Sequence, residues 1–287
     1  MAFRSSEYLQ RNELVRYQLD DAIRSPGNNQ HQIENGCKFT IKDRSSFYDW
    51  YYAYFEVQFQ LQKIADGDGY VAADRITVIN GAHILIKDLL IKSAGKIVYD
   101  NDNLHNVTFV KNLLEYSDDC SLSITINSLW YLDTNNTTTN TDTRFEARRL
   151  LTQAAAVDAL NAGGKDVKFI IPLNRYSFVE ELEDKMLVPM QLQFNTELND
   201  DDELIHKPYA ADNDRVVVNR FLLWIPKLTP KDSTYNIFFS SFVKETQWTY
   251  MREMYEVSAF TTASGFFQIS ASIDNVKHIF VYLKKKL

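Results

Sequence analysis

The sequence contains few cysteines and no long apolar stretch. Among 287 residues only Cys37 and Cys120 are cysteines, too few for a disulfide framework, so reduced and buried thiols are expected. No apolar run reaches the roughly 18 residues of a membrane-spanning helix. The first residues, MAFRSSEYLQRNE, also lack the apolar segment of a secretory signal. These absences predict a protein that is made and kept inside a cell.

Basic residues are outnumbered. The chain has 31 Lys and Arg against 38 Asp and Glu, which gives a formal net charge of −7. A surface of this charge repels a phosphate backbone, so no specific nucleic-acid binding is expected. The three lysines at positions 284–286 are interpreted as a solubilising end of the chain.

Motifs for catalysis and metal binding are also missing. The segment SAGK at 93–96 lacks the frame of a phosphate-binding loop and predicts a hairpin turn. No G-x-S-x-G elbow is present, and the acidic residues at 200–203, Asp66 and Asp68 are interpreted as solvated loops. The histidines show no spacing typical of zinc ligands: His31, His83, His105, His206 and His278. We therefore predict no catalytic, cofactor-binding or metal-binding residues, and a protein that is not an enzyme.

Aromatic and β-branched residues, by contrast, are abundant. Aromatics make up 13% of the chain, with 16 Tyr and 18 Phe, and this favours strands around a packed core. A long strand with alternating apolar residues is predicted within residues 48–62, and further strands at 128–134, 169–174, 188–195 and 214–220. Three more strands are predicted at 250–260, 265–271 and 277–283.

A few helices are predicted between these strands. Residues 1–32 read as a helical arm, with an amphipathic helix over 5–25. Helices are also expected at 104–117 and 145–160, and after Thr229, which would cap a helix with Pro230 at its first position. The polar segment 135–143 is predicted to be an exposed loop.

The order of the strand patterns suggests that the chain is built twice. EVQFQLQ at 56–62 is echoed by VPMQLQFN at 188–195, and DRITVIN at 74–80 is echoed by DRVVVNR at 214–220. The soft segment at 163–167 would divide the halves. We therefore predict the arm at 1–32 and two consecutive β-sandwich domains, at 33–165 and 166–287.

Several segments carry a resemblance to a known family. VINGAHILIKDLLIKSAGKIVYD (78–100), FIIPLNRYSFVEELEDKMLVPMQLQF (169–194) and VVVNRFLLWIPKLTP (216–230) resemble strands of the double jelly-roll major capsid proteins of polinton-like and adintovirus-like elements. The resemblance extends from about Cys37 onward. Proteins of that family run on beyond the strand that residues 277–283 resemble, so the likeness implies a second jelly roll shortened at its C-terminal end.

The resemblance implies an all-β fold of two consecutive jelly-roll domains with short inserted helices. It further implies a structural capsid subunit that forms homotrimeric capsomers and contacts neighbouring capsomers, with a penton protein as a candidate partner. The protein would be located in the virion, after synthesis in the cytoplasm or nucleus of the host. No cofactor is implied.

Two other interpretations remain open. The chain could be a domesticated or secreted-type, lectin-like jelly-roll binding module that uses the loop at 135–143 and assembles no capsid, or an enzyme on a cupin-like jelly roll. The second would need a set of histidine and carboxylate metal ligands that the sequence does not show. An incomplete second jelly roll would also expose one sheet edge, which we expect the arm at 1–32 or a neighbouring subunit to cover.

Overall fold

The computed structural model describes most of the chain between residues 9 and 256. The described residues are 9–17, 36–43, 46–63, 77–78, 81–117, 126–131, 143–152, 166–183, 185, 187, 189–206, 214–233, 235–236, 250–256 and 279. A first compact unit spans Met1–Met254 and a second spans Tyr255–Leu287. All the strands and helices given below belong to the first unit.

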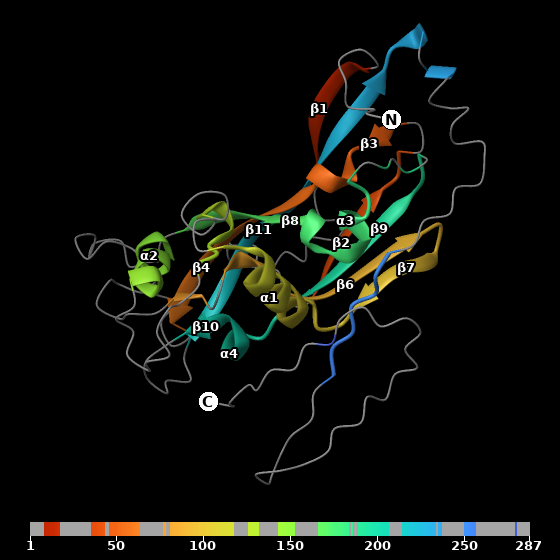
Figure 1. Ribbon diagram of the computed structural model, residues 1–287. Coiled ribbons are helices and arrows are strands. Elements are labelled where there is room, and N and C mark those ends of the chain that lie inside the picture. Colours follow the sequence, from red (N-terminus) through yellow and green to blue (C-terminus); the bar gives the residue numbers. More distant parts are fainter. Residues whose placement is uncertain are drawn as a thin grey trace, which may run out of the picture. The chain divides into compact units, whose positions relative to one another are not determined.

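Two antiparallel sheets form the body of this unit (Figure 1). The first sheet has the order β1-β11-β4-β8, and the short strand β3 also pairs with β11. The second sheet has the order β2-β9-β6-β7, and β5 and β10 form a separate two-stranded pair. The strands are β1 (Leu9–Tyr17), β2 (Cys37–Ile41), β3 (Phe47–Tyr48), β4 (Tyr54–Lys63), β5 (Thr77–Val78), β6 (Ile86–Ser93), β7 (Lys96–Asn101), β8 (Val167–Pro172), β9 (Leu192–Leu198), β10 (Ile205–His206) and β11 (Asp214–Pro230).

Short helices lie between the strands. The α-helices are α1 (Leu104–Glu115), α2 (Thr143–Thr152), α3 (Ser177–Glu180) and α4 (Asp201–Leu204). Single 3-10 turns are η1 (Trp50–Tyr52), η3 (Ala82–Leu85), η5 (Ile126–Ser128) and η6 (Leu173–Arg175). Within the described part of the chain, no helix is long and apolar enough to cross a lipid bilayer.

The core lies between the two sheets and is rich in aromatic rings. On β4 the alternate residues Phe55, Val57, Phe59 and Leu61 are all buried, as their period of two predicts. Phe39 of β2 reaches across from the second sheet, with its ring 5.6 Å from Phe55 and 5.4 Å from Phe221 of β11. Edge-to-face and offset contacts of this kind add to the burial of each ring.

The strand order is that of a jelly roll. The eight principal strands, taken along the chain, are β1, β2, β4, β6, β7, β8, β9 and β11. The first sheet combines the first, eighth, third and sixth of them, and the second sheet combines the second, seventh, fourth and fifth. This interleaving results when a pair of long antiparallel ribbons folds over into two facing sheets. The predicted all-β jelly-roll class with short inserted helices is confirmed.

The position of the predicted domain boundary requires correction. β2 pairs with β9, and β4 pairs with both β8 and β11, so strands from both sides of residue 165 share both sheets. The described strands between Leu9 and Pro230 thus form one jelly roll, and a second one stays a prediction. The segments that echo each other in the sequence do not occupy equivalent places in the fold. Residues 56–62 lie in β4 of the first sheet, whereas residues 192–195 lie in β9 of the second, and Thr77 and Val78 form the short β5, whereas residues 214–220 begin the long β11.

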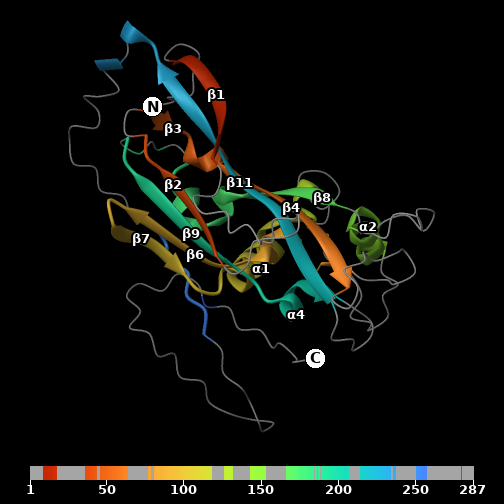
Figure 2. The same ribbon diagram turned by 180° about the vertical axis from the view of Figure 1, so that it is seen from behind.

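The helical arm is also corrected. Residues 9–17 form strand β1, which pairs antiparallel with β11 from Leu9 opposite Pro230 to Tyr17 opposite Leu223. The backbone of β11 offers hydrogen-bonding partners along its edge, and this tertiary pairing outweighs the helical pattern of the sequence. Residues 9–17 thus form a principal strand of this jelly roll (Figure 2), and a cover over the edge of a second jelly roll stays a prediction. The rest of residues 1–32 lies outside the described residues.

Local predictions had mixed outcomes. The helices at 104–117 and 145–160 are confirmed by α1 and by α2 as far as Thr152, and the hairpin turn at 93–96 joins β6 to β7. The strand predicted at 128–134 is wrong for its described residues, because η5 and Leu129, with φ at 55°, interrupt the extended backbone. A helix does follow Thr229, because residues 232–233 and 235–236 are helical, but it begins after Pro230, since β11 continues through Thr229 and Pro230. Residues 250–256 are not a strand either. The two strands predicted at 265–271 and 277–283 lie outside the described residues, except for Ile279.

Candidate functional site

The described residues among those weighed as metal ligands do not form a metal site. His83 lies in η3 and His105 in α1, both buried, whereas His206 ends β10. The acidic residues at 200–203 begin α4 and do not form a loop, while His31, Asp66, Asp68 and His278 lie outside the described residues. Among the described residues, no group of three or more His, Cys, Asp and Glu side chains could hold a metal ion. Cys37 carries a free, buried thiol. Its burial raises the pKa of this thiol to about 12.

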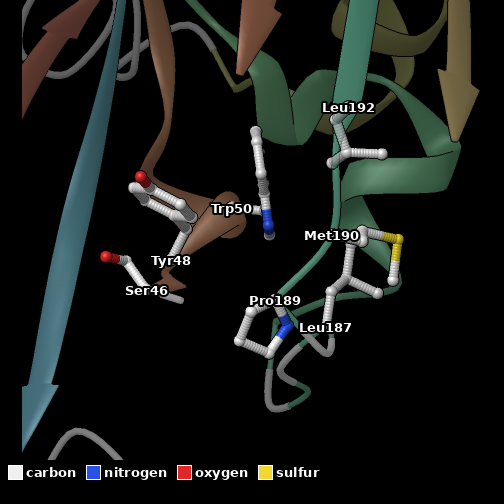
Figure 3. Close-up of a pocket in the computed structure, with 7 residues that line it drawn as sticks. All are labelled: Ser46, Tyr48, Trp50, Leu187, Pro189, Met190 and Leu192. Carbon is white, nitrogen blue, oxygen red and sulfur yellow. The ribbon is translucent and has the colours of Figure 1, made fainter. Parts of the chain in front are cut away.

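One hollow lies at the end of the sandwich where β3 meets the start of β9. Its walls are Ser46, Tyr48, Trp50, Leu187, Pro189, Met190 and Leu192. Figure 3 shows Trp50 between Tyr48 on one side and Leu192 and Met190 on the other. The Trp50 ring stacks on Phe194 of β9 at 5.6 Å, and the side chains leave no room for even one water molecule. This hollow is a packed apolar seam between the two sheets.

A network of polar side chains adjoins this seam. The hydroxyl groups of Tyr17 and Tyr48 are 2.6 Å apart, and the Tyr48 hydroxyl also donates to Asp43 at 3.2 Å. Lys227 of β11 lies 3.6 Å from the same carboxylate oxygen. Burial, followed by the hydrogen bond with Tyr17, raises the pKa of Tyr48, so its hydroxyl stays protonated. The network fastens β1, β3 and β11 to one another.

A second hollow is more polar and contains an unpaired buried nitrogen. Its walls include His83, Asn112, Ser128, Trp130 and Arg175, and its space of about 10 Å³ is close to what one water molecule needs. His83 Nε2 is buried and has no hydrogen-bond partner. Burial, then the nearby charges of Arg175 and His105, lower the pKa of His83 to about 3, so the ring is neutral at ordinary pH.

Arg175 is held firmly at the rim of this hollow. Its Nε donates to Asn112 Oδ1 at 2.8 Å, and a terminal nitrogen lies 2.8 Å from Glu115 Oε2. The guanidinium carbon is 4.5 Å from the centre of the Tyr116 ring, a cation–π distance. The C-terminal end of α1 and the turn η6 are thereby tied together. The arrangement has no nucleophile paired with a base, and its chemistry is that of structural support.

The outer face of the first sheet bears a third polar cluster. Glu56 of β4 is buried, accepts a hydrogen bond from Trp224 Nε1 at 3.1 Å, and lies 3.0 Å from Lys168 Nζ of β8. Asp166 accepts hydrogen bonds from Gln58 at 2.5 Å and Asn219 at 3.2 Å. These contacts link β8, β4 and β11 across the sheet, so they too hold strands in place.

Sequence analysis missed these three clusters because their members are far apart in the chain. Tyr17 and Lys227, or Glu56 and Trp224, become neighbours only through the pairing of β1 and β4 with β11. Gly81 is the local feature of the sequence that marks one of these clusters. Its φ of 104° is a backbone conformation in which other residues are strained, and it lies directly beside the His83 ring.

The comparisons with known proteins agree with the fold. No protein-family model matches the sequence, and no curated protein matches it. Among solved structures, the chain is similar to a chain in the cryo-EM structure of the Sputnik virophage, at 10% identity and a TM-score of 0.50, over 79% of this chain and 49% of that one. It is also similar to the mavirus major capsid protein, at 10% identity and a TM-score of 0.41, over 77% of this chain and 48% of that one.

The first of these similarities is one of fold. The Sputnik chain is a double jelly-roll major capsid protein, so the resemblance predicted from the sequence is confirmed at the level of fold. The chain spans about half the length of the solved chains it matches.

Proposed function

We propose that the protein is a structural capsid subunit and not an enzyme. The observation that carries the proposal is the complete interleaved order of eight strands, which the chain shares in fold with a virophage capsid protein. A shell subunit needs rigid walls and broad lateral surfaces, and it needs no catalytic residues. The filled seam at Trp50 and the strand-tying polar clusters are consistent with such a role.

In this proposal the jelly roll between Leu9 and Pro230 corresponds to one of the two jelly rolls of a capsid protein. Three subunits would associate into a homotrimeric capsomer, since closed rotational symmetry is the usual way for identical chains to satisfy one another's surfaces. The further partners would be neighbouring capsomers and, as a candidate, a penton protein. The protein would reside in the virion, after synthesis in the host cytoplasm or nucleus. No specific nucleic-acid contact is proposed, in keeping with the net charge of −7.

Size-exclusion chromatography with light scattering tests the proposal. The purified full chain is expected to show a mass near three times the 33.3 kDa of one chain, or a larger assembly, with the larger species favoured as concentration rises. A protein that stays at 33.3 kDa over a wide range of concentration and at ordinary salt would overturn the self-association. A monomer that binds glycans would instead support the lectin-like alternative.

A further inference from the structure

A short segment that follows the jelly roll in the chain is docked on its side. Residues 250–254 have no regular secondary structure and lie beside β7, drawn in blue in Figure 1. They contact the edge strand β7 and helix α3, and they belong to the same compact unit as the sandwich. The exposed side chains Met251 and Met254 do not account for this docking, because 41% and 50% of their surfaces remain accessible to water.

Tyr250 provides the apolar part of the contact. Its ring meets Phe178 of α3 edge-on at 5.5 Å and lies 6.2 Å from the ring of Tyr99. Its hydroxyl donates a hydrogen bond to the carbonyl of Val98. The pairing of β6 with β7 skips Val98 at a bulge, so this residue has no opposite partner in β6. Tyr250 therefore caps an irregular point in an edge strand.

Glu253 provides the polar part of the contact. One of its carboxylate oxygens, Oε2, accepts hydrogen bonds from the Tyr99 hydroxyl at 3.0 Å and from Ser177 Oγ at 3.1 Å. The one cation nearby on α1, Lys111, is already paired with Glu180 of α3. The carboxyl group thus enters a site that offers hydroxyl donors and only a shared positive charge.

We propose that a proton on Glu253 controls the docking of residues 250–254, and that the segment is held more tightly when this carboxyl group is protonated. A partly buried carboxylate with little compensating charge costs free energy, whereas a neutral carboxyl group fits the same hydroxyl-lined site. Two side chains therefore control the docking of residues 250–254. The ring of Tyr250 anchors the segment, and the carboxyl group of Glu253 opposes its docking when charged.

The charges around Glu253 fix the direction of the effect. Burial is the largest influence and raises the pKa of Glu253, Glu180 raises it further, and Lys111, Tyr99 and Ser177 lower it without reversing the shift. Burial is the largest cause of the raised pKa values of Tyr176 and Tyr99. The negative charge of Glu253 raises both pKa values further. On the segment itself, the positive charge of Arg252 acts on Tyr250 and lowers its pKa, against the larger effect of burial, which raises it.

A docked state with a raised pKa binds the proton more strongly than the released state does. Docking is therefore strengthened as pH falls through the pKa of docked Glu253, and weakened as pH rises above it. Each unit by which docking raises the pKa corresponds to about a tenfold difference in the docking equilibrium between the two protonation states. The segment directly precedes Tyr255, where the second compact unit begins.

Hydrogen–deuterium exchange of the full chain tests this proposal. Amide exchange at residues 250–254 is measured from acidic to mildly alkaline pH and corrected for the intrinsic pH dependence of exchange. Protection is expected to fall as pH rises in the wild type. Glu253→Gln, which is neutral and keeps an acceptor oxygen, is expected to hold the segment at every pH and to remove the pH dependence.

Two further variants separate the proton from the rest of the contact. Tyr250→Phe removes the bond to Val98 and is expected to lower protection at all pH values while the pH dependence remains. Glu181→Gln, in a solvent-accessible pair with Lys185 on the turn after α3, is the matched control and is expected to behave as the wild type does. An unchanged pH slope in Glu253→Gln, or wild-type protection that grows with pH, would overturn the proposal. The readout is local to the segment, so it is independent of whether the protein self-associates.

Discussion

Replacing Gly81 with alanine should destabilise the fold much more than the same change at Gly95. Gly81 precedes η3 with φ at 104° and ψ at 168°, a backbone region that is populated almost only by glycine. A Cβ at this position would lie 3.1 Å from His83 Nδ1 and 3.2 Å from the carbonyl oxygen of Ser128. His83 is buried against the Trp130 ring at 5.4 Å, so neither neighbour can move away easily.

The expected cost follows from these two effects. Backbone strain accounts for about 1–3 kcal/mol and crowding in a packed interior for a further 1–3 kcal/mol or so, which places Gly81→Ala near 3 kcal/mol. Gly95, in the turn between β6 and β7, has φ at 84° but nothing within 4 Å of a Cβ. Only the backbone term applies there, so Gly95→Ala should cost about 1 kcal/mol.

Urea unfolding of both variants and the wild type measures the difference. The midpoint of unfolding should shift clearly further for Gly81→Ala, with the slope against urea unchanged. Equal losses in the two variants would refute the close packing of Gly81 against His83 and Ser128.

Three further predictions concern the sandwich. In a double-mutant cycle, Phe39→Leu and Phe221→Leu should be non-additive in the free energy of unfolding by about 0.5–1.5 kcal/mol, and strict additivity in urea unfolding would argue against their contact across the sheets. Burial, followed by the hydrogen bond and charge of Glu197, raises the pKa of Asp88 to about 6, so the melting temperature should rise as pH falls from 7 towards the unfolded-state value of 3.8. Asp88→Asn should flatten that rise, and a melting temperature of the variant that follows pH as the wild type does would contradict the assignment. Deletion of residues 1–17 uncovers the edge of β11 and should cause aggregation in light scattering, whereas a soluble truncated protein would show that β1 has no covering role.

Local patterns in the sequence were sufficient for several elements. The alternation in β4, the helical stretch of α1, and the small residues of the β6–β7 turn each depend on neighbours within a few positions. The sheet partners of those strands depend on distant residues. β4 looks like β9 because both bury alternate side chains in one core, and this likeness between two strands of one jelly roll was read as a duplication of the chain. Residues 9–17 have a helical stripe, yet pairing with β11 makes them a strand.

The clusters that make up the candidate site were beyond prediction for the same reason. Glu253 is 154 residues from Tyr99 and 76 from Ser177, and no spacing rule joins them. Buried Glu56 looks like a solvent-facing residue in the alternation of β4, and its burial follows from contacts with β8 and β11. The sequence does predict the character of these positions. Polar residues on aromatic-rich strands tend to be hydrogen-bonded wherever the fold buries them.

The central claim is that residues 9–230 form one jelly roll whose sheets combine both halves of the chain, and a cross-strand disulfide tests it most directly. Thr40 of β2 and Gln193 of β9 are opposite partners in the second sheet. Opposite residues of antiparallel strands have Cα atoms about 4.5–5.5 Å apart, within the range that a disulfide spans. Thr40→Cys with Gln193→Cys should yield a disulfide-linked peptide pair on mild oxidation of the folded protein. The control pair Thr40→Cys with Lys168→Cys, whose members lie in different sheets, should not be linked. Free thiols at positions 40 and 193 in the folded, oxidised protein would contradict the interleaved jelly roll and remove the basis of the proposed capsid function.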